Sequence, residues 1–233
     1  MMSMLVRSSV IAAFLSLVAQ PALAGQVTIA NPFGSFQVKA ESLNELRWEN
    51  VVRQQYDFSC GSAAVATLLT YHYERPTSEA AVFESMIKLG DAEKIRTYGF
   101  SMLDMKQYLD SQGLNSDGFR VKLDDFIGIG LPAITLINTG GYKHFVVIKG
   151  MDNGNVLVGD PAVGTVVVPK DYFETLWTGT VLGAREDMLL AQQYFNNDRD
   201  WQVRPDSPLK QGMQRSAIGS AMLPLPGRNE LGR

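Results

Sequence analysis

The sequence predicts an α+β fold in which N-terminal helices pack on an antiparallel sheet. Residues 60–112 contain three segments with helix-start and helix-stop signals. Residues 118–184 contain six segments that are rich in β-branched residues and that Gly, Pro, Asn and Asp separate. Helices that precede the strands, instead of alternating with them, are typical of α+β proteins.

The first helix is expected from Cys60 to about Tyr73. Ser59 is a candidate N-cap, the alanines that follow favour a helix, and Pro76 closes the segment. These signals place the cysteine in the first turn of the helix.

Two further helices have boundary signals of their own. The second follows Thr77 or Ser78. The third covers Met102–Gln112, where Ser101 and Asp104 have the spacing of a capping box.

The strands follow these helices. Asn153-Gly154 is a strong hairpin signal between two of them, and a short helix is expected at 169–177. The expected strands are 118–123, 132–138, 144–152, 155–160, 164–169 and 179–184.

The first 24 residues have the pattern of a secretory signal peptide. Arg7 gives a basic start, Val10–Ala19 is a short apolar run, and Ala22-Leu23-Ala24 has the small-x-small form that signal peptidase cleaves. We therefore expect cleavage before Gly25 and a periplasmic protein. No later segment is long enough to cross a membrane, so no stable membrane span is expected after cleavage.

The remaining 209 residues (233 minus 24) suit one domain with appendages. Their formal charge is about −4, from 20 Lys and Arg (21 minus Arg7) against 24 Asp and Glu, which argues against a nucleic-acid partner. We expect an N-terminal arm at 25–50, one domain at 51–185, and a C-terminal extension at 186–233. That extension has lost apolar periodicity and is predicted to be largely extended or disordered.

Cys60 is the single cysteine, so it cannot form an intrachain disulfide. The positive end of the helix dipole favours the thiolate, which is the reactive form of the side chain. The alternative is that Cys60 is a small hydrophobic residue at a tightly packed helix start. A reactive thiol needs partners: a base, a group that orients the base, and donors for an oxyanion.

The sequence has two histidines that could act as the base. His72 lies twelve residues along the helix of Cys60, about 18 Å away, and we interpret it as a solvated or capping residue. His144 begins a strand after Gly140-Gly141, from which it can project into a cleft. Its alternative is an ordinary half-buried strand residue.

Asp160 is the candidate orienting group, at a strand end before Pro161. A regular two-residue turn would pair Asp160 with Val147, on the face opposite to His144, so a bulge or a longer turn is required. Its alternative is an aspartate that starts a turn. Asp152 has the right chemistry, but its neighbours place it in the turn.

Gln54 and Gln55 both have the side-chain amide that an oxyanion donor requires. Their alternative is an ordinary polar loop, and residue chemistry alone leaves both open.

Three stretches together resemble the C39 peptidases, the double-glycine or bacteriocin-leader-processing cysteine proteases. They are QQYDFSCGSAA from Gln54, HFVVIKG from His144 and DPA from Asp160, within a region from Val51 to Gly183. Ser59 departs from the aspartate that many members carry before the cysteine.

The resemblance implies a papain-like cysteine peptidase fold, with Cys60 as nucleophile and His144 as general base and acid. It also implies that Asp160 orients the imidazole and that Gln54 forms part of the oxyanion hole. Gln54 is preferred over Gln55 because the family places its glutamine six residues before the cysteine. A C39 peptidase cuts after a Gly-Gly pair without metal or cofactor, which agrees with the few Cys and His residues.

The expected function is therefore an exported cysteine endopeptidase that cleaves a peptide or protein substrate. Stand-alone exported relatives accompany secretion systems, including those for functional amyloid, so a secretion machinery is an expected partner. Two alternatives are a non-catalytic papain-like module that binds a substrate for such a system and a hydrolase of cell-wall peptides.

Overall fold

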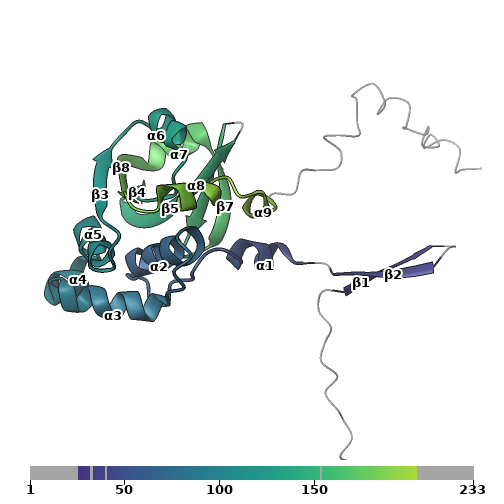
Figure 1. Cartoon of the computed structure of the whole chain (residues 1–233), viewed down its shortest axis with the longest axis horizontal. Coiled ribbons are helices and arrows are strands. Elements are labelled where there is room, and N and C mark those ends of the chain that lie inside the picture. Colours follow the sequence, from purple (N-terminus) through teal and green to yellow (C-terminus); the bar gives the residue numbers. More distant parts are fainter. Residues whose placement is uncertain (1–25, 32–33, 40, 153, 204–233) are drawn as a thin grey trace, which may run out of the picture. The chain divides into compact units, whose positions relative to one another are not determined.

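The computed structural model describes residues 26–31, 34–39, 41–152 and 154–203 (Figure 1). The chain divides into two compact units, with the boundary between Ser42 and Leu43. The predicted signal peptide and residues 204–233 of the expected C-terminal extension lie outside the described residues.

The first unit contains an antiparallel strand pair, β1 (Gln26–Asn31) and β2 (Gly34–Lys39). The register runs from Gln26 opposite Lys39 to Asn31 opposite Gly34. We expected one extended arm over residues 25–50. Within that range the structure has this extended strand pair, followed by the helix α1 (Leu43–Trp48), which belongs to the second unit.

Four helices lie between α1 and the first strand of the second unit. The three helices that the sequence predicts are present. Two of them have a serine N-cap whose side chain accepts a backbone hydrogen bond, Ser78 in one and Ser101 in the other. The fourth was not predicted: Asp91 accepts hydrogen bonds from the two N–H groups that start it, and Gly99, with φ of 76°, ends it. They are α2 (Cys60–His72), α3 (Glu79–Leu89), α4 (Ala92–Tyr98) and α5 (Met102–Ser111).

The second unit also contains a six-stranded antiparallel sheet with the order β3-β8-β4-β5-β6-β7. This confirms the α+β prediction. The first strand ends earlier than expected, because Leu123 begins a helix, α6. The elements are β3 (Ser116–Arg120), α6 (Leu123–Ile129), β4 (Ala133–Thr139), β5 (Tyr142–Asp152), β6 (Asn155–Asp160), β7 (Gly164–Pro169), α7 (Lys170–Leu176) and β8 (Trp177–Ala184).

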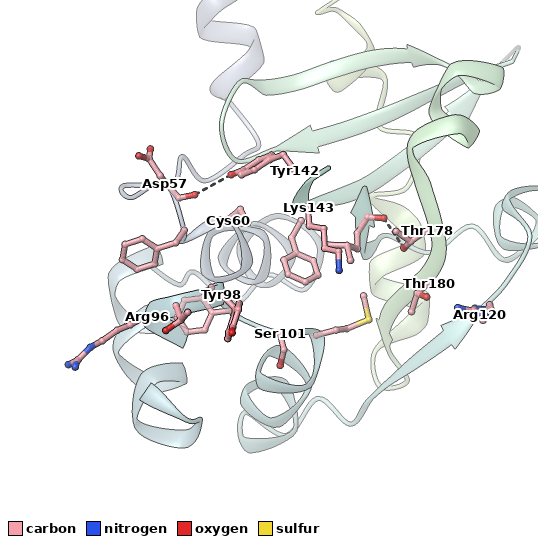
Figure 2. Close-up of a pocket in the computed structure, with 17 residues that line it drawn as sticks. Asp57, Cys60, Arg96, Tyr98, Ser101, Arg120, Tyr142, Lys143, Thr178 and Thr180 are labelled. Carbon is pink, nitrogen blue, oxygen red and sulfur yellow. Dashed lines mark hydrogen bonds between the residues drawn. The ribbon is translucent and has the colours of Figure 1, made fainter. Parts of the chain in front are cut away.

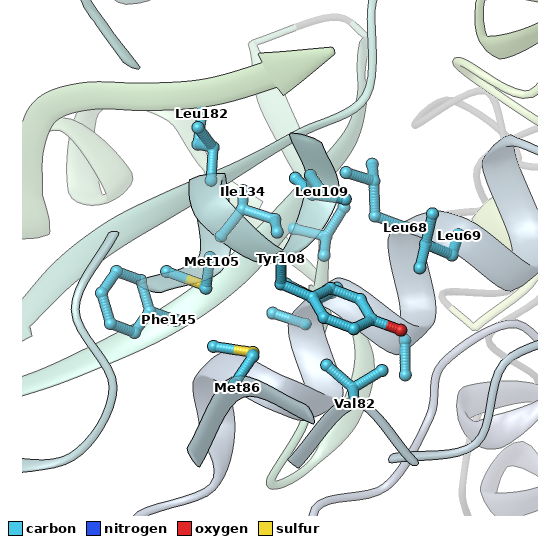
Figure 3. Packing of buried hydrophobic residues seen from close by; sticks show 14 of the residues in the cluster. Leu68, Leu69, Val82, Met86, Met105, Tyr108, Leu109, Ile134, Phe145 and Leu182 are labelled. Carbon is cyan, nitrogen blue, oxygen red and sulfur yellow. The ribbon is translucent and has the colours of Figure 1, made fainter. Parts of the chain in front are cut away.

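Helices α2 and α5 cover one face of the sheet, and α3 packs on both of them. Their apolar side chains form one buried cluster with those of β4, β5 and β8, which includes Leu68, Met105, Ile134 and Leu182 (Figure 3). Nearly every residue of α2 is buried, which explains its small side chains: a Cβ on Gly61 would lie 3.0 Å from the Cβ of Phe100.

Helices α6 and α7 cover the opposite face of the sheet. Phe126 and Phe173 from these helices pack against Val146, Ile148 and Val158 of the central strands. The sheet is therefore buried on both faces at its centre, which explains the uninterrupted apolar run in β5.

A β-bulge in β5 changes the face that its side chains occupy. Asp152 pairs with Asn155 next to the turn, as a two-residue hairpin requires, but the register shifts between Ile148 and Gly150. Lys149 is the extra residue. Beyond it, Val147 pairs with Gly159, so the side chain of Asp160 lies on the face of the sheet that His144 occupies.

The side chain of Lys149 is fully buried and ion-paired. Its Nζ lies 2.8 Å from Oδ2 of Asp200 and donates to the carbonyl oxygen of Asn50 at 3.0 Å. The other carboxylate oxygen of Asp200 accepts from the Asn50 amide at 2.9 Å. Burial lowers the pKa of Lys149 despite the raising effect of Asp200.

Asp200 comes from the segment that we expected to be extended. Residues 188–201 instead form two short helices, α8 (Met188–Gln193) and α9 (Asp198–Trp201). Asn196, between them, donates its N–H to the carbonyl of Lys149 at 2.9 Å and packs so closely on Gly150 that no Cβ would fit there. The segment is part of the domain because it completes the environment of the buried lysine.

His72, at the end of α2, is buried, contrary to our expectation of a solvated or capping residue. Neither ring nitrogen has a hydrogen-bond partner among the described residues, and the ring meets that of Tyr194 edge to face at 6.4 Å. Burial, with the nearby charge of Lys149, lowers the pKa of His72 well below its usual value. The imidazole is therefore neutral in the folded protein.

Removal of the Asp200 carboxylate tests the buried ion pair. Asp200→Ala leaves Lys149 buried without a counter-charge, so we expect the free energy of unfolding to fall by about 3–5 kcal/mol in urea titrations at pH 7. The matched control is Arg185→Ala, which breaks the more exposed pair with Asp117 and should cost less than about 1 kcal/mol. Equal losses for the two variants would contradict this account.

The buried His72 predicts acid sensitivity. Below about pH 6.5, His72 is protonated in the unfolded chain but stays neutral in the folded protein. The free energy of unfolding therefore falls as the pH is lowered, by up to about 1.4 kcal/mol per pH unit for this residue. His72→Gln removes the titration and should flatten the dependence of the unfolding free energy on pH between 5 and 6.5. An unchanged slope would show that His72 is protonated in the fold.

Candidate active site

The loop before α2 is held around one carbonyl group. The oxygen of Tyr56 accepts hydrogen bonds from Nε2 of Gln54 at 3.1 Å and from the N–H and hydroxyl of Ser59 at 3.1 and 3.0 Å. Ser59 takes the N-cap position, as expected, but its side chain makes no capping bond to the helix. Ser59 is fully buried and fixes the loop instead, which sets the position of Cys60.

Cys60 is the first residue of α2, and its side chain reaches a cleft of about 610 Å³ (Figure 2). The residue is only 8% exposed. The first backbone N–H groups of a helix have no partner within the helix, so donors are available beside the sulfur.

His144 and Asp160 are directly hydrogen bonded. Nε2 of His144 lies 2.8 Å from Oδ1 of Asp160, which also accepts from the N–H of Ala162 at 2.7 Å. The bulge at Lys149 makes this contact possible, because it shifts the register of the hairpin by one residue. A bulge of this kind was one of the two ways in which we expected Asp160 to reach the face of His144. Asp160 also starts a turn, as the alternative for this residue holds, since its Oδ1 and carbonyl oxygen accept from the N–H groups of Ala162 and Val163. The contact with His144 is present in addition to that turn.

The His144 ring interacts with Cys60 as well as Asp160. Burial lowers the pKa of His144, but the hydrogen bonds and charges of Asp160 and Cys60 outweigh it and raise the pKa to about 9. The ring therefore carries a proton at neutral pH. Its other nitrogen, Nδ1, is buried and makes no hydrogen bond with a described residue, so it is available to accept or donate a proton.

Gln54 lies near this group through its backbone. Its N–H donates to the carbonyl of Pro161 at 3.0 Å, which ties the loop before Cys60 to the turn that carries Asp160. Its side-chain amide is bonded to Tyr56 inside the loop, and Oε1 is buried without a partner among the described residues. Gln55 is exposed.

Tyr142 completes the site and was not predicted. Its ring stacks on that of His144, with centroids 6.0 Å apart and an angle of 25°, and its hydroxyl donates to the carbonyl of Asp57 at 3.3 Å (Figure 2). Burial and the charges of Cys60, Asp57 and Asp160 raise the pKa of Tyr142. An aromatic residue two positions before a strand histidine shares its face, which is the signal that could have indicated it.

The structure thus brings together a thiol, an imidazole and a carboxylate, with Gln54 beside them. These are the groups that nucleophilic acyl transfer by a cysteine requires. The described residues contain no cluster of three His, Cys, Asp or Glu side chains that could hold a metal ion. Among the described helices, none is long and apolar enough to span a membrane.

The chain is similar in sequence and in fold to several known proteins. The sequence pattern described as "Peptidase C39 family" matches residues 48–187. The chain is 40% identical over 169 residues to the "Probable functional amyloid protease FapD" of Pseudomonas fluorescens, which spans 72% of this chain and 75% of that protein. It is 42% identical over 153 residues to the protein of the same name from Pseudomonas aeruginosa, over 65% of this chain and 68% of that one.

A solved structure supports the fold. The peptidase domain of Streptococcus ComA, described as a bi-functional ABC transporter, matches 58% of this chain and 96% of that domain, with a TM-score of 0.50 and 22% identity. The papain-like α+β fold is thereby confirmed. With a family match over more than half of its length and relatives at 40% identity, this chain belongs to the peptidase C39 family of cysteine proteases.

Proposed function

We propose that this protease is an exported cysteine endopeptidase that uses Cys60, His144 and Asp160 in an acyl-enzyme mechanism. The observation that carries the proposal is the 2.8 Å contact between His144 and Asp160 beside the sulfur of Cys60. A cysteine whose only role was to fill the core would not need an imidazole and a carboxylate next to it.

The first chemical step is attack on a peptide carbonyl. The protonated His144 beside Cys60 stabilises a thiolate, whose sulfur forms a bond to the carbonyl carbon while the carbonyl π electrons move to oxygen. The backbone N–H groups at the start of α2 donate to this oxyanion, and the amide of Gln54 joins them when it leaves the carbonyl of Tyr56.

The second step breaks the peptide bond. His144 gives its proton to the amine nitrogen, the C–N bond breaks, and the thioester with Cys60 remains. A water molecule then gives a proton to His144, and its hydroxide adds to the carbonyl carbon of the thioester. The C–S bond breaks, which releases the carboxylic acid and returns the thiolate of Cys60 beside the protonated His144. Asp160 holds the ring in place throughout, because its carboxylate accepts from Nε2.

The resemblance to C39 peptidases supports cleavage after small residues such as Gly-Gly. The name of the Pseudomonas relatives supports a role in a functional amyloid secretion system. The signal-peptide pattern at residues 1–24 supports a periplasmic site of action. A secretion machinery is the expected partner.

The two alternative functions differ in their products. A non-catalytic module would release nothing, whereas a cell-wall hydrolase would release wall peptides. We would express the wild type and Cys60→Ala in the bacterial envelope and compare new protein N-termini and muropeptides by mass spectrometry. Protein N-termini that depend on Cys60 are expected, and a change confined to muropeptides would support the wall hydrolase. Identical profiles would contradict both enzyme functions.

Thiol alkylation tests the activation of Cys60. Because the imidazolium of His144 stabilises the thiolate, we expect iodoacetamide at pH 7 to modify Cys60 at least about tenfold faster in the wild type than in His144→Ala. His72→Ala is the matched control, since it also removes a buried histidine, and it should leave the rate unchanged. Intact mass spectrometry measures the adduct, and equal rates in the wild type and His144→Ala would refute the activation.

The raised pKa of His144 predicts a basic limb in the pH profile. Amine release needs the protonated ring, so kcat/KM for a quenched fluorescent Gly-Gly peptide should fall as pH rises through about 9. Asp160→Asn keeps an acceptor for Ala162 but removes the charge, so the limb should move to lower pH by about one to three units. A limb that stays in place would show that Asp160 does not hold the proton on His144.

A further inference from the structure

The cleft beside Cys60 is lined by three basic residues from three different elements. Arg96 comes from α4, Arg120 from β3 and Lys143 from β5, and all three are exposed. Figure 2 shows the amino group of Lys143 in the middle of the cleft and Arg96 at its edge, pointing outward. The chain as a whole has a net charge of −3, so its composition does not explain a basic cleft.

One acidic residue, Asp57, lines the same cleft. Its carboxylate points away from the cavity, and its backbone oxygen accepts from Tyr142 (Figure 2). The positive charge in the cleft is therefore not balanced by the cleft's own carboxylate.

The three cations also lack partners elsewhere among the described residues. Most other basic side chains of the fold are paired, as Lys106 is with Asp110 and Arg185 with Asp117. The side chains of Arg96, Arg120 and Lys143 make no hydrogen bond or ion pair with a residue that the structure describes. Carboxylates that could neutralise them are thus left for a bound molecule to supply.

We infer that the cleft selects peptide segments that carry Asp or Glu side chains near the bond to be cut. Lys143 and Arg120 would receive these carboxylates, Lys143 as a point charge and Arg120 through its planar guanidinium group. Leu136, Met102 and Phe145 also line the cleft, and they supply apolar surface for the rest of the peptide segment. This inference rests on the proposed function only in taking the cleft as the substrate site.

Binding to an inactive variant tests the inference without requiring catalysis. Two rhodamine-labelled peptides would share Gly-Gly and the flanking apolar residues and would differ only by Glu or Gln at the remaining positions. Their affinities for Cys60→Ala are measured by fluorescence anisotropy. We expect the Glu peptide to bind about three- to tenfold more tightly at about 50 mM salt, and the ratio to fall toward one at about 500 mM.

Charge reversal locates the effect. Arg120→Glu in the Cys60→Ala background should abolish or reverse the preference for the Glu peptide. Lys88→Glu is the matched control, because Lys88 is an exposed residue at the end of α3 that does not line the cleft. The control should keep the preference, and Lys143→Gln should reduce it.

Three outcomes would overturn the inference. They are equal affinities at low salt, no binding of either peptide at about 1 mM protein, and equal effects of Arg120→Glu and Lys88→Glu, which would indicate net charge alone. If Cys60→Ala prefers the Glu peptide while the wild type cleaves neither peptide, the inference about binding stands and the proposed protease mechanism fails. The two failures are therefore distinguishable.

Discussion

The extra residue Lys149 in β5 is the constraint on which the site depends. Side chains alternate between the faces of a strand, so a regular hairpin would place Asp160 behind the sheet from His144. The bulge moves the register by one residue, and the carboxylate comes within 2.8 Å of the ring. Without that shift the carboxylate of Asp160 would lie on the other face of the sheet from the imidazole of His144.

The bulge is maintained by burial of a charge. Lys149 points into the protein, where Asp200 and the carbonyl of Asn50 compensate it. Asp200 is 40 residues beyond Asp160 in the chain, on a helix of one turn that would not be stable alone. The C-terminal segment and the bulge in β5 thus depend on each other. Asp200 supplies the counter-charge for Lys149, and Lys149 supplies the ion pair and the carbonyl group on which the segment is held.

The charges around the cleft have two separate arrangements. At its inner end, Asp160, His144 and Cys60 form a buried chain in which proximity sets the protonation of the ring. On its walls, the side chains of Lys143 and Arg120 have no hydrogen-bond or ion-pair partner in the part of the chain that the structure describes. Tyr142 contacts both regions, since it lines the cleft, stacks on the ring of His144 and donates to the carbonyl of Asp57.

Local patterns in the sequence predicted the helices α2, α3, α5 and α7, the strand order along the chain and the chemistry of Cys60, His144 and Asp160, because capping residues, β-branched runs and turn residues act over a few positions. They also indicated that a bulge or longer turn was needed, although not where. Only the tertiary structure decided that Lys149 is the bulged residue, that His72 is buried, that residues 188–201 are helical and that Tyr142 covers His144. The first three of these depend on contacts between residues far apart in the chain, such as Lys149 with Asp200, and no local pattern contains the energy of a long-range ion pair. Tyr142 and His144 are only two residues apart on β5, but the orientation of the two rings is set by the packing around them.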